Sequence, residues 1–234
     1  MQPQYRLLYL ENSIYYALLE YLATQKLGER LITTDNITYT GFTGLPLNFL
    51  RPLKVYKNGL EIDTGYVVNY LQNKITFDTP NNPSDVITVD YYYNFVEAIT
   101  SFPDDINLEI TIPSIAIDYD FTVSRPIELG TKRRREYADR YILQLYTSSD
   151  TERKVITDML TQDLLLRSIP YIDFDLGYPL NVDGTKNLNY NPALQTIGYI
   201  DFDNITTRSF RGGRYGEVDL YVMEIETTVI SYIL

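Results

Sequence analysis

The sequence predicts an α+β fold, in which one sheet has two helices packed on one face and a small all-β module is inserted into the chain. Apolar residues recur at helical spacing near the start of the chain and again after residue 149. Between and after these segments, apolar and polar residues alternate as they do in strands. Helices grouped on one face of a sheet are typical of this fold class. We expect residues 1–40 and 100–234 to form the core domain and residues 41–99 to form the inserted module.

The first helix is predicted from about Ser13 to Leu27. Ile14, Leu18 and Leu22 lie on one apolar face at helical spacing. Gly28 follows and can end the helix.

The inserted module is predicted to be a compact set of four or five strands. Asn58-Gly59 separates two short alternating runs, and this pair is a strong hairpin signal because both turn positions need positive φ. A second turn is expected at Gln72-Asn73. The polar loop 79–85 then leads into a further strand from Val86 to Tyr93.

The core domain is predicted to resume with two long strands and a second helix. The strands run over Pro113–Phe121 and Arg133–Tyr146, where apolar residues alternate. Ser149 and Glu152 form a capping box, so a helix is expected from there to near Arg167. Residues 168–210 are rich in Asn, Gly and Pro and are expected to be irregular, and a last strand follows from Glu217 towards Leu234.

Composition excludes several kinds of chemistry. The 234 residues contain no Cys and no His, so disulfides, thiolate metal sites and Ser–His or Cys–His nucleophile pairs cannot be built within the chain. The formal net charge of −11 does not attract the DNA backbone by bulk charge. Tyrosine, present 23 times, is enriched at protein interfaces. We therefore predict no enzyme activity, no catalytic, cofactor-binding or metal-binding residues and no cofactor.

The chain is also expected to be soluble and to have no contact with a membrane. No apolar run approaches the ~20 residues that span a bilayer. No basic region precedes an apolar stretch at the start, as it does in a signal peptide.

Three groups of residues have a functional interpretation beside a plain one. The repeated pentapeptides Tyr-Ile-Asp-Phe-Asp at 171–175 and 199–203, together with Asp118 and Asp120, could supply acid pairs for a hydrolase or Ca²⁺ ligands. They could also be an exposed polar face alternating with buried Ile and Phe. Tyr91–Tyr93 could be a sugar-stacking platform of a carbohydrate-binding module, or an ordinary strand.

Basic residues form the third group. The run at 132–135 could be a solvated loop or strand end, a subunit contact or a DNA contact, and the Arg-Gly tract at 208–216 reads best as a hairpin turn with flanking arginines. The interface candidates are Lys132, Arg133, Arg134, Arg135, Arg211 and Arg214.

The ordered pattern from Ser114 to Asp175 resembles the tail-terminator, or tail-completion, proteins of tailed bacteriophages. The matching pieces are a strand at 114–119, Pro-Ile-Glu-Leu-Gly at 126–130, a basic strand ending in Tyr-Ile-Leu-Gln-Leu-Tyr at 141–146, the capped helix and its exit at 169–174. The N-terminal helix and the last strand also fit, so the resemblance covers roughly residues 5–30 and 106–234. The β segment 55–93 and the arm 176–198 depart from a minimal terminator.

The resemblance implies a structural virion protein of the phage neck that is assembled in the host cytoplasm. Such a protein forms a homo-oligomeric, hexameric ring that caps the tail tube, ends its polymerisation and joins the tail to the head connector. Its implied partners are the tail tube protein, a neck or head-completion protein and the tail sheath protein, while genomic DNA passes through without specific binding. The alternatives are another neck, connector or baseplate structural protein and, second, a carbohydrate-binding module.

Overall fold

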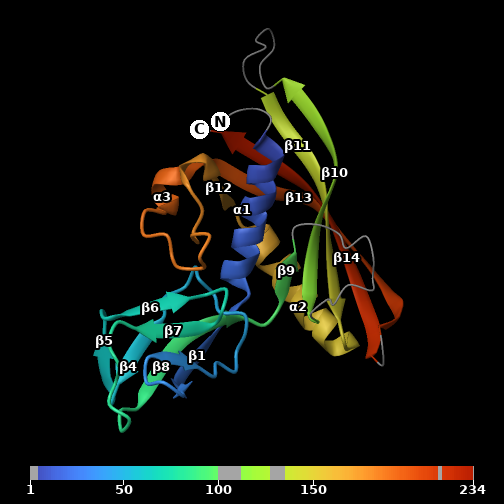
Figure 1. The fold of residues 1–234 in the computed structure, drawn as a ribbon. Helices are drawn as coiled ribbons and strands as arrows, with labels where there is room; N and C mark the ends of the chain where they lie inside the picture. Colours follow the sequence, from blue (N-terminus) through green and yellow to red (C-terminus); the bar gives the residue numbers. More distant parts are fainter. Residues whose placement is uncertain (1–4, 100–111, 127–134, 216–217, 234) are drawn as a thin grey trace. The chain divides into compact units, whose positions relative to one another are not determined.

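The computed structural model describes residues 5–99, 112–126, 135–215 and 218–233 (Figure 1). The chain divides into two compact units, each formed by segments that are distant in sequence. The first unit comprises Met1–Leu18, Val96–Asp175 and Pro192–Leu234, and the second comprises Leu19–Phe95 and Leu176–Asn191.

Strands dominate the chain and form one six-stranded and two four-stranded sheets. The helical elements are α1 (Arg6–Tyr21), α2 (Asp150–Gln162), η2 (Leu164–Leu166), η3 (Phe174–Leu176) and α3 (Pro192–Gln195). The short strands are β1 (Ala23–Arg30), β2 (Ile32–Thr33), β3 (Thr38–Thr40), β4 (Lys54–Lys57), β5 (Leu60–Ile62), β6 (Tyr66–Asn69), β7 (Lys74–Phe77), β8 (Ile87–Asn94), β9 (Glu97–Ile99) and β12 (Ile169–Ile172). The long strands are β10 (Ser114–Pro126), β11 (Arg135–Thr147), β13 (Thr196–Tyr215) and β14 (Val218–Ile233). The predicted α+β class, one sheet with two helices on one face, is therefore wrong, because the described residues are mostly β and form three sheets.

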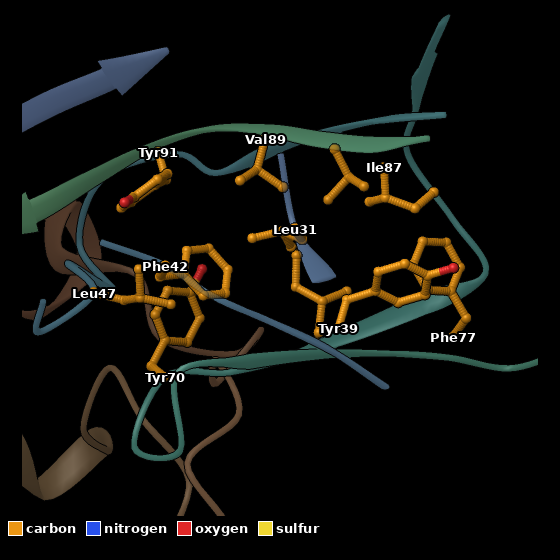
Figure 2. Packing of buried hydrophobic residues seen from close by; sticks show 11 residues of the cluster. Leu31, Tyr39, Phe42, Leu47, Tyr70, Phe77, Ile87, Val89 and Tyr91 are labelled. Carbon is orange, nitrogen blue, oxygen red and sulfur yellow. The ribbon is translucent and has the colours of Figure 1, made fainter. Parts of the chain in front are cut away.

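The second unit consists of two four-stranded sheets with a common core. One sheet has the order β1-β8-β4-β5 and the other β2-β3-β7-β6. Val89 from the first sheet and Ile75 from the second are fully buried in one apolar cluster, and Figure 2 shows side chains of both sheets pointing into it. Side chains that alternate along each strand produce one apolar inner face per sheet, as in a β-sandwich.

The turns predicted in this unit are confirmed. Asn58 and Gly59 both have positive φ, 52° and 82°, and link β4 to β5. Asn73, at φ 49°, turns the chain between β6 and β7. Among the amino acids, Gly and Asn adopt a positive φ at the lowest cost in free energy. These turns could therefore be located from the sequence.

A half-buried carboxylate fixes the loop that follows β3. Glu29 accepts hydrogen bonds from the Thr43 N–H at 3.1 Å and from the Tyr91 hydroxyl. Burial raises the pKa of Glu29, but the hydrogen bonds from Thr43 and Tyr91 outweigh that effect and lower it to about 2. The ionised Glu29 therefore holds the loop against β8.

The arm at 177–191 forms neither helix nor strand apart from an isolated bridge between Leu180 and Lys186, as predicted, and it is hydrogen-bonded to the turn after β6. The Tyr70 N–H donates to the Gly184 carbonyl at 2.9 Å, and the Asn69 side chain donates to the Asp183 carbonyl at 2.8 Å. Gly184 has φ 84°, and a Cβ there would lie 2.7 Å from the Asn69 side-chain oxygen. A glycine is thus required for the arm to approach this turn.

The first helix was placed too late along the chain. It runs over Arg6–Tyr21, and the residues after it form β1, which pairs with β8 from Ala23↔Asn94 to Arg30↔Thr88. Gly28, predicted to end the helix, has φ 63° within the irregular part of β1. Pairing with a distant strand therefore overrides the local helical pattern.

The six-stranded sheet of the first unit has the order β12-β13-β14-β11-β10-β9. The predicted strands at 113–121 and 133–146 correspond to β10 and β11, which pair antiparallel. The prediction that residues 168–210 are irregular is wrong at β12 and along β13 as far as Phe210, and these two strands pair with each other. The two Tyr-Ile-Asp-Phe-Asp segments begin on these two strands, where Pro170 is paired with Tyr199.

The start of α2 is confirmed. Ser149 is the N-cap, and its side chain accepts the Glu152 N–H at 3.2 Å. The Glu152 carboxylate returns to the Ser148 N–H, at 3.3 Å, rather than to the cap residue itself. Local hydrogen bonds of this kind stabilise a helix end by about 1 kcal/mol.

Candidate functional site

The six-stranded sheet has two long open edges. β9 covers β10 only at Ser114–Ala116, and β12 covers β13 only up to Ile200. Within the described parts of the chain, no strand pairs with the outer side of β10 at 117–126 or of β13 at 201–215. We call these two segments the open edges. Unpaired backbone N–H and C=O groups along an edge are a template for adding a strand of another chain.

The edges of the second unit differ from these open edges. β2, β5 and β6, which are edge strands of its sheets, have two, three and four residues. β1 is longer, but its register shifts between Lys26 and Glu29 and it carries charged side chains there. Short, bulged and charged edges resist pairing with other chains. The open edges of the first unit are therefore the stronger candidates for an assembly surface.

Both edge strands carry a β-bulge at the same level of the sheet. In β10 the register shifts at Asp120. This position lies next to Arg140 of β11, which is paired with Thr228 of β14. In β13 it shifts after Asp203, which is paired with the same Thr228. Bulges bend strands and increase their twist. Two bulges at one level curve the whole sheet, as closure into a barrel requires.

One face of this sheet is buried and is tied to α1 by an ion pair. The Arg6 guanidinium donates to both carboxylate oxygens of Asp139 at 2.5 and 2.7 Å, and Asp139 is 0% exposed. Thr122 of β10 donates to the same carboxylate, and the Arg6 guanidinium lies 4.2 Å from the centre of the Tyr137 ring. Burial lowers the pKa of Arg6, but the hydrogen bonds and charge of Asp139 outweigh it and raise the pKa above its ordinary value.

A second set of hydrogen bonds holds α1 against β12. Ser13 donates to the Tyr9 carbonyl at 2.7 Å and accepts the Ile172 N–H at 3.0 Å. The Tyr171 hydroxyl donates to the Arg6 carbonyl at 3.0 Å. Burial raises the pKa of Tyr171, so the hydroxyl stays protonated and remains a donor at neutral pH. The helix and the sheet therefore form one rigid layer behind the open edges.

The opposite face of the sheet carries a buried apolar cluster near one end, formed by Ala116, Tyr146, Leu220 and Val222, and its charged side chains are mostly acidic. We call the part of this face outside the apolar cluster the polar face. Its described charged side chains, placed by strand register and by their ion pairs, are Asp118, Asp120, Arg140, Asp201, Asp203, Arg208, Glu224 and Glu226. Carboxylates outnumber guanidinium groups here, so the face repels phosphate backbones.

A chain of ion pairs crosses the polar face from one open edge to the other. Arg140 of β11 lies 3.5 Å from Asp120 of β10 and 2.5 Å from Glu226 of β14. Glu226 in turn lies 3.5 Å from Arg208 of β13. We call these four residues the charge ladder. It begins with a carboxylate at one open edge and ends with a guanidinium at the other.

The predicted interface residues are only partly visible and do not form one group. Lys132, Arg133 and Arg134 lie outside the described residues. Arg135 is the first residue of β11, whereas Arg211 and Arg214 lie on β13 on either side of a register shift. Register places Arg135 and Arg211 at opposite ends of the sheet, since Arg135 is near the Ser231 end of β14 and Arg211 is paired with Tyr221.

The structure also places the other candidate residues within the fold. Tyr91 is 1% exposed and lies in the core of the second unit, so it cannot stack on a sugar (Figure 2). Asp173 accepts the Asp175 N–H, and Asp201 accepts the Ser168 hydroxyl. No group of three or more Asp or Glu side chains within the described ranges is arranged to hold a metal ion. Among the helices that the structure describes, none is both long and apolar enough to cross a membrane.

The charge ladder was missed by sequence reasoning because its members come from four strands and are up to 106 positions apart in the chain, from Asp120 to Glu226. The only local signal is alternation: Arg140, Arg208 and Glu226 each lie between residues that point to the opposite face. No family model, curated protein or solved structure matches this chain.

Proposed function

We propose that this chain is a structural subunit of a tailed-phage neck, which assembles head to tail into a closed ring that ends the tail tube. The observation that carries the proposal is the pair of open edges on one curved sheet. The sequence resemblance to tail terminators supports the same conclusion. The chain acts through contacts among copies and neighbours rather than by catalysis.

The strand directions favour a closed ring. The strands from β13 through β14 and β11 to β10 alternate in direction, so the two open edges run antiparallel to each other. A second copy rotated about an axis along the strands keeps its strand directions, and its β13 then meets β10 as an antiparallel neighbour. The same step repeated gives a head-to-tail interface that closes into a ring.

Barrel geometry favours about six copies. Four long strands from each of six copies give a barrel of roughly 24 strands, about 48 Å across at the backbone for a spacing of ~4.8 Å and a tilt of ~40°. Side chains leave a channel of roughly 35 Å, which admits a DNA duplex. A ring of four copies is only roughly 32 Å across at the backbone, and its side chains obstruct much of the bore.

The polar face is the surface that lines this channel in the proposed ring. The buried face is covered within each subunit by contacts such as Arg6–Asp139, so it lies on the outside of the barrel together with α1. The channel then carries the excess of carboxylates described above, which keeps DNA from adhering as it passes. The ends of the barrel are left to contact the tail tube on one side and a neck protein on the other.

Deletion of the gene from the phage that encodes this chain tests the proposal. We expect tails of uncontrolled length by electron microscopy, because the tube no longer receives its terminal ring. Supply of the protein from a plasmid should restore a single tail length and serves as the control. Tails of normal, uniform length in the deletion mutant would show that the protein does not end the tube.

A further inference from the structure

We propose that the charge ladder continues from one copy of the chain to the next, with Arg208 of one copy paired to Asp120 of its neighbour. The inference rests on the proposed ring and specifies the register in which the open edges meet. Asp120 and Arg208 are the two ends of the ladder, and their charges are opposite. Their side chains are 42% and 69% exposed, so each can accept a further partner.

The ladder crosses the strands at about the angle at which a horizontal circle around a barrel crosses its tilted strands. The ladder starts beside Arg140 on β11 and ends at Arg208, which is level with Gln144 on the same strand through Glu224. Four residues along a strand over three strand spacings is a slope of about 45°, close to the tilt of strands in barrels. The ladder therefore runs at constant height around the ring axis, and Arg208 reaches the neighbour at the height of its Asp120.

This register also avoids the short strands that cover parts of each edge. If the edges met without a shift, Ser124 would face Ile200, because Ser124, Tyr137, Ser231 and Ile200 lie on one level of the sheet. Ile200 already pairs with β12. When Asp120 of one copy lies beside Arg208 of the next, the open edge 117–126 lies opposite about residues 202–211 of that neighbour. None of these residues pairs with β12.

The alternation of charge explains how one register is selected. Backbone pairing alone permits the edges to slide, and a flat polar edge specifies its register weakly. Each closed ring contains one continuous circle of alternating carboxylates and guanidinium groups only when Arg208 meets Asp120. A slip in either direction leaves the terminal charges of both ladders without this partner, which penalises wrong registers.

Cysteine cross-linking provides a direct test, because the natural chain has no cysteine. Within one copy, β10 and β13 are separated by two strands, or about 14 Å, beyond the ~7 Å reach of a disulfide. The double variant Asp118→Cys with Phe210→Cys can therefore cross-link only between copies, and it keeps all four residues of the charge ladder. When Asp120 faces Arg208 on antiparallel strands, residue 118 faces residue 210. Upon oxidation we expect a series of covalent oligomers that ends at the closed ring, seen on a non-reducing gel.

The matched control is Asp118→Cys with Thr206→Cys, which places the second cysteine at the unshifted level of the same edge. We expect it to form at least about tenfold less cross-linked oligomer, because the two Cα atoms lie too far apart. If mass and microscopy show a ring, but the control pair 118/206 links as well as the pair 118/210, or neither pair links, the proposed register is overturned while the ring is not. A protein that stays monomeric contradicts the ring itself, and the register with it.

Discussion

Asp139→Ala is expected to lower the free energy of unfolding of the first unit by about 3–5 kcal/mol. The substitution leaves the Arg6 guanidinium buried without its carboxylate, since Asp139 is 0% exposed and Arg6 is 9% exposed. It also removes the acceptor of the Thr122 hydroxyl. Denaturant titration followed by circular dichroism measures the loss.

Two further variants separate charge burial from a general sensitivity to substitution. Lys154→Ala removes an exposed ion pair with Asp150, in which the lysine is 66% exposed, and should cost less than about 1 kcal/mol. Arg6→Met combined with Asp139→Leu removes both charges together and should cost less than Asp139→Ala alone. A loss for Asp139→Ala as small as that for Lys154→Ala would mean that the buried pair does not hold α1 to the sheet.

Val123→Lys is expected to break the ring while leaving the subunit folded. Val123 lies on the open edge of β10 and is 47% exposed, so a lysine there fits the monomer but places a charge beside the neighbour's edge. We expect the dissociation constant between subunits to rise about 100-fold or more. Mass photometry over a range of protein concentrations measures the shift from ring to monomer.

Val67→Lys is a closely matched control for this variant. Val67 lies on β6, an edge strand of the second unit, and is 48% exposed. The same substitution at the same exposure should leave the ring intact, because the account assigns no role in assembly to that edge. A ring of unchanged stability for Val123→Lys would contradict the assignment of β10 to the interface, and loss of the ring in both variants would show that the effect is not specific to the open edge.

Features fixed by neighbouring residues could be predicted from the sequence. The Asn58-Gly59 turn and the Ser149 cap are set by positive φ and by local hydrogen bonds, and both are confirmed. The alternation that predicted β11 is also confirmed. In each case the residues that decide the structure lie within a few positions of each other.

Features that depend on distant pairing were predicted wrongly. The residues after Tyr21 read as helix but pair with β8 some 70 positions later, from Ala23↔Asn94 onward. The range 168–210 is rich in turn residues, yet β13 within it pairs with β12 and β14. Both errors underestimated the strand content, and for this reason the predicted fold class was wrong.

The candidate site was harder to predict from the sequence than the fold was. The basic run at 132–135 was predicted to be an interface because its charges are consecutive in sequence. The charge ladder instead brings together single charges from four strands. Of its members, only Asp120 and Arg208 belong to groups that the sequence singles out, and those groups suggest other roles. Whether an edge is open depends on which strands pair beside it, and this follows only from the topology of the complete sheet.

The central claim, that this chain works by closing its sheet edge to edge with copies of itself, is tested most directly by the mass and symmetry of the purified protein. The account predicts a particle of about six subunits of 27.2 kDa, with sixfold symmetry and a central channel in electron micrographs. A particle of 27.2 kDa at every concentration, or an assembly in which the edges of β10 and β13 remain exposed to solvent, would contradict it.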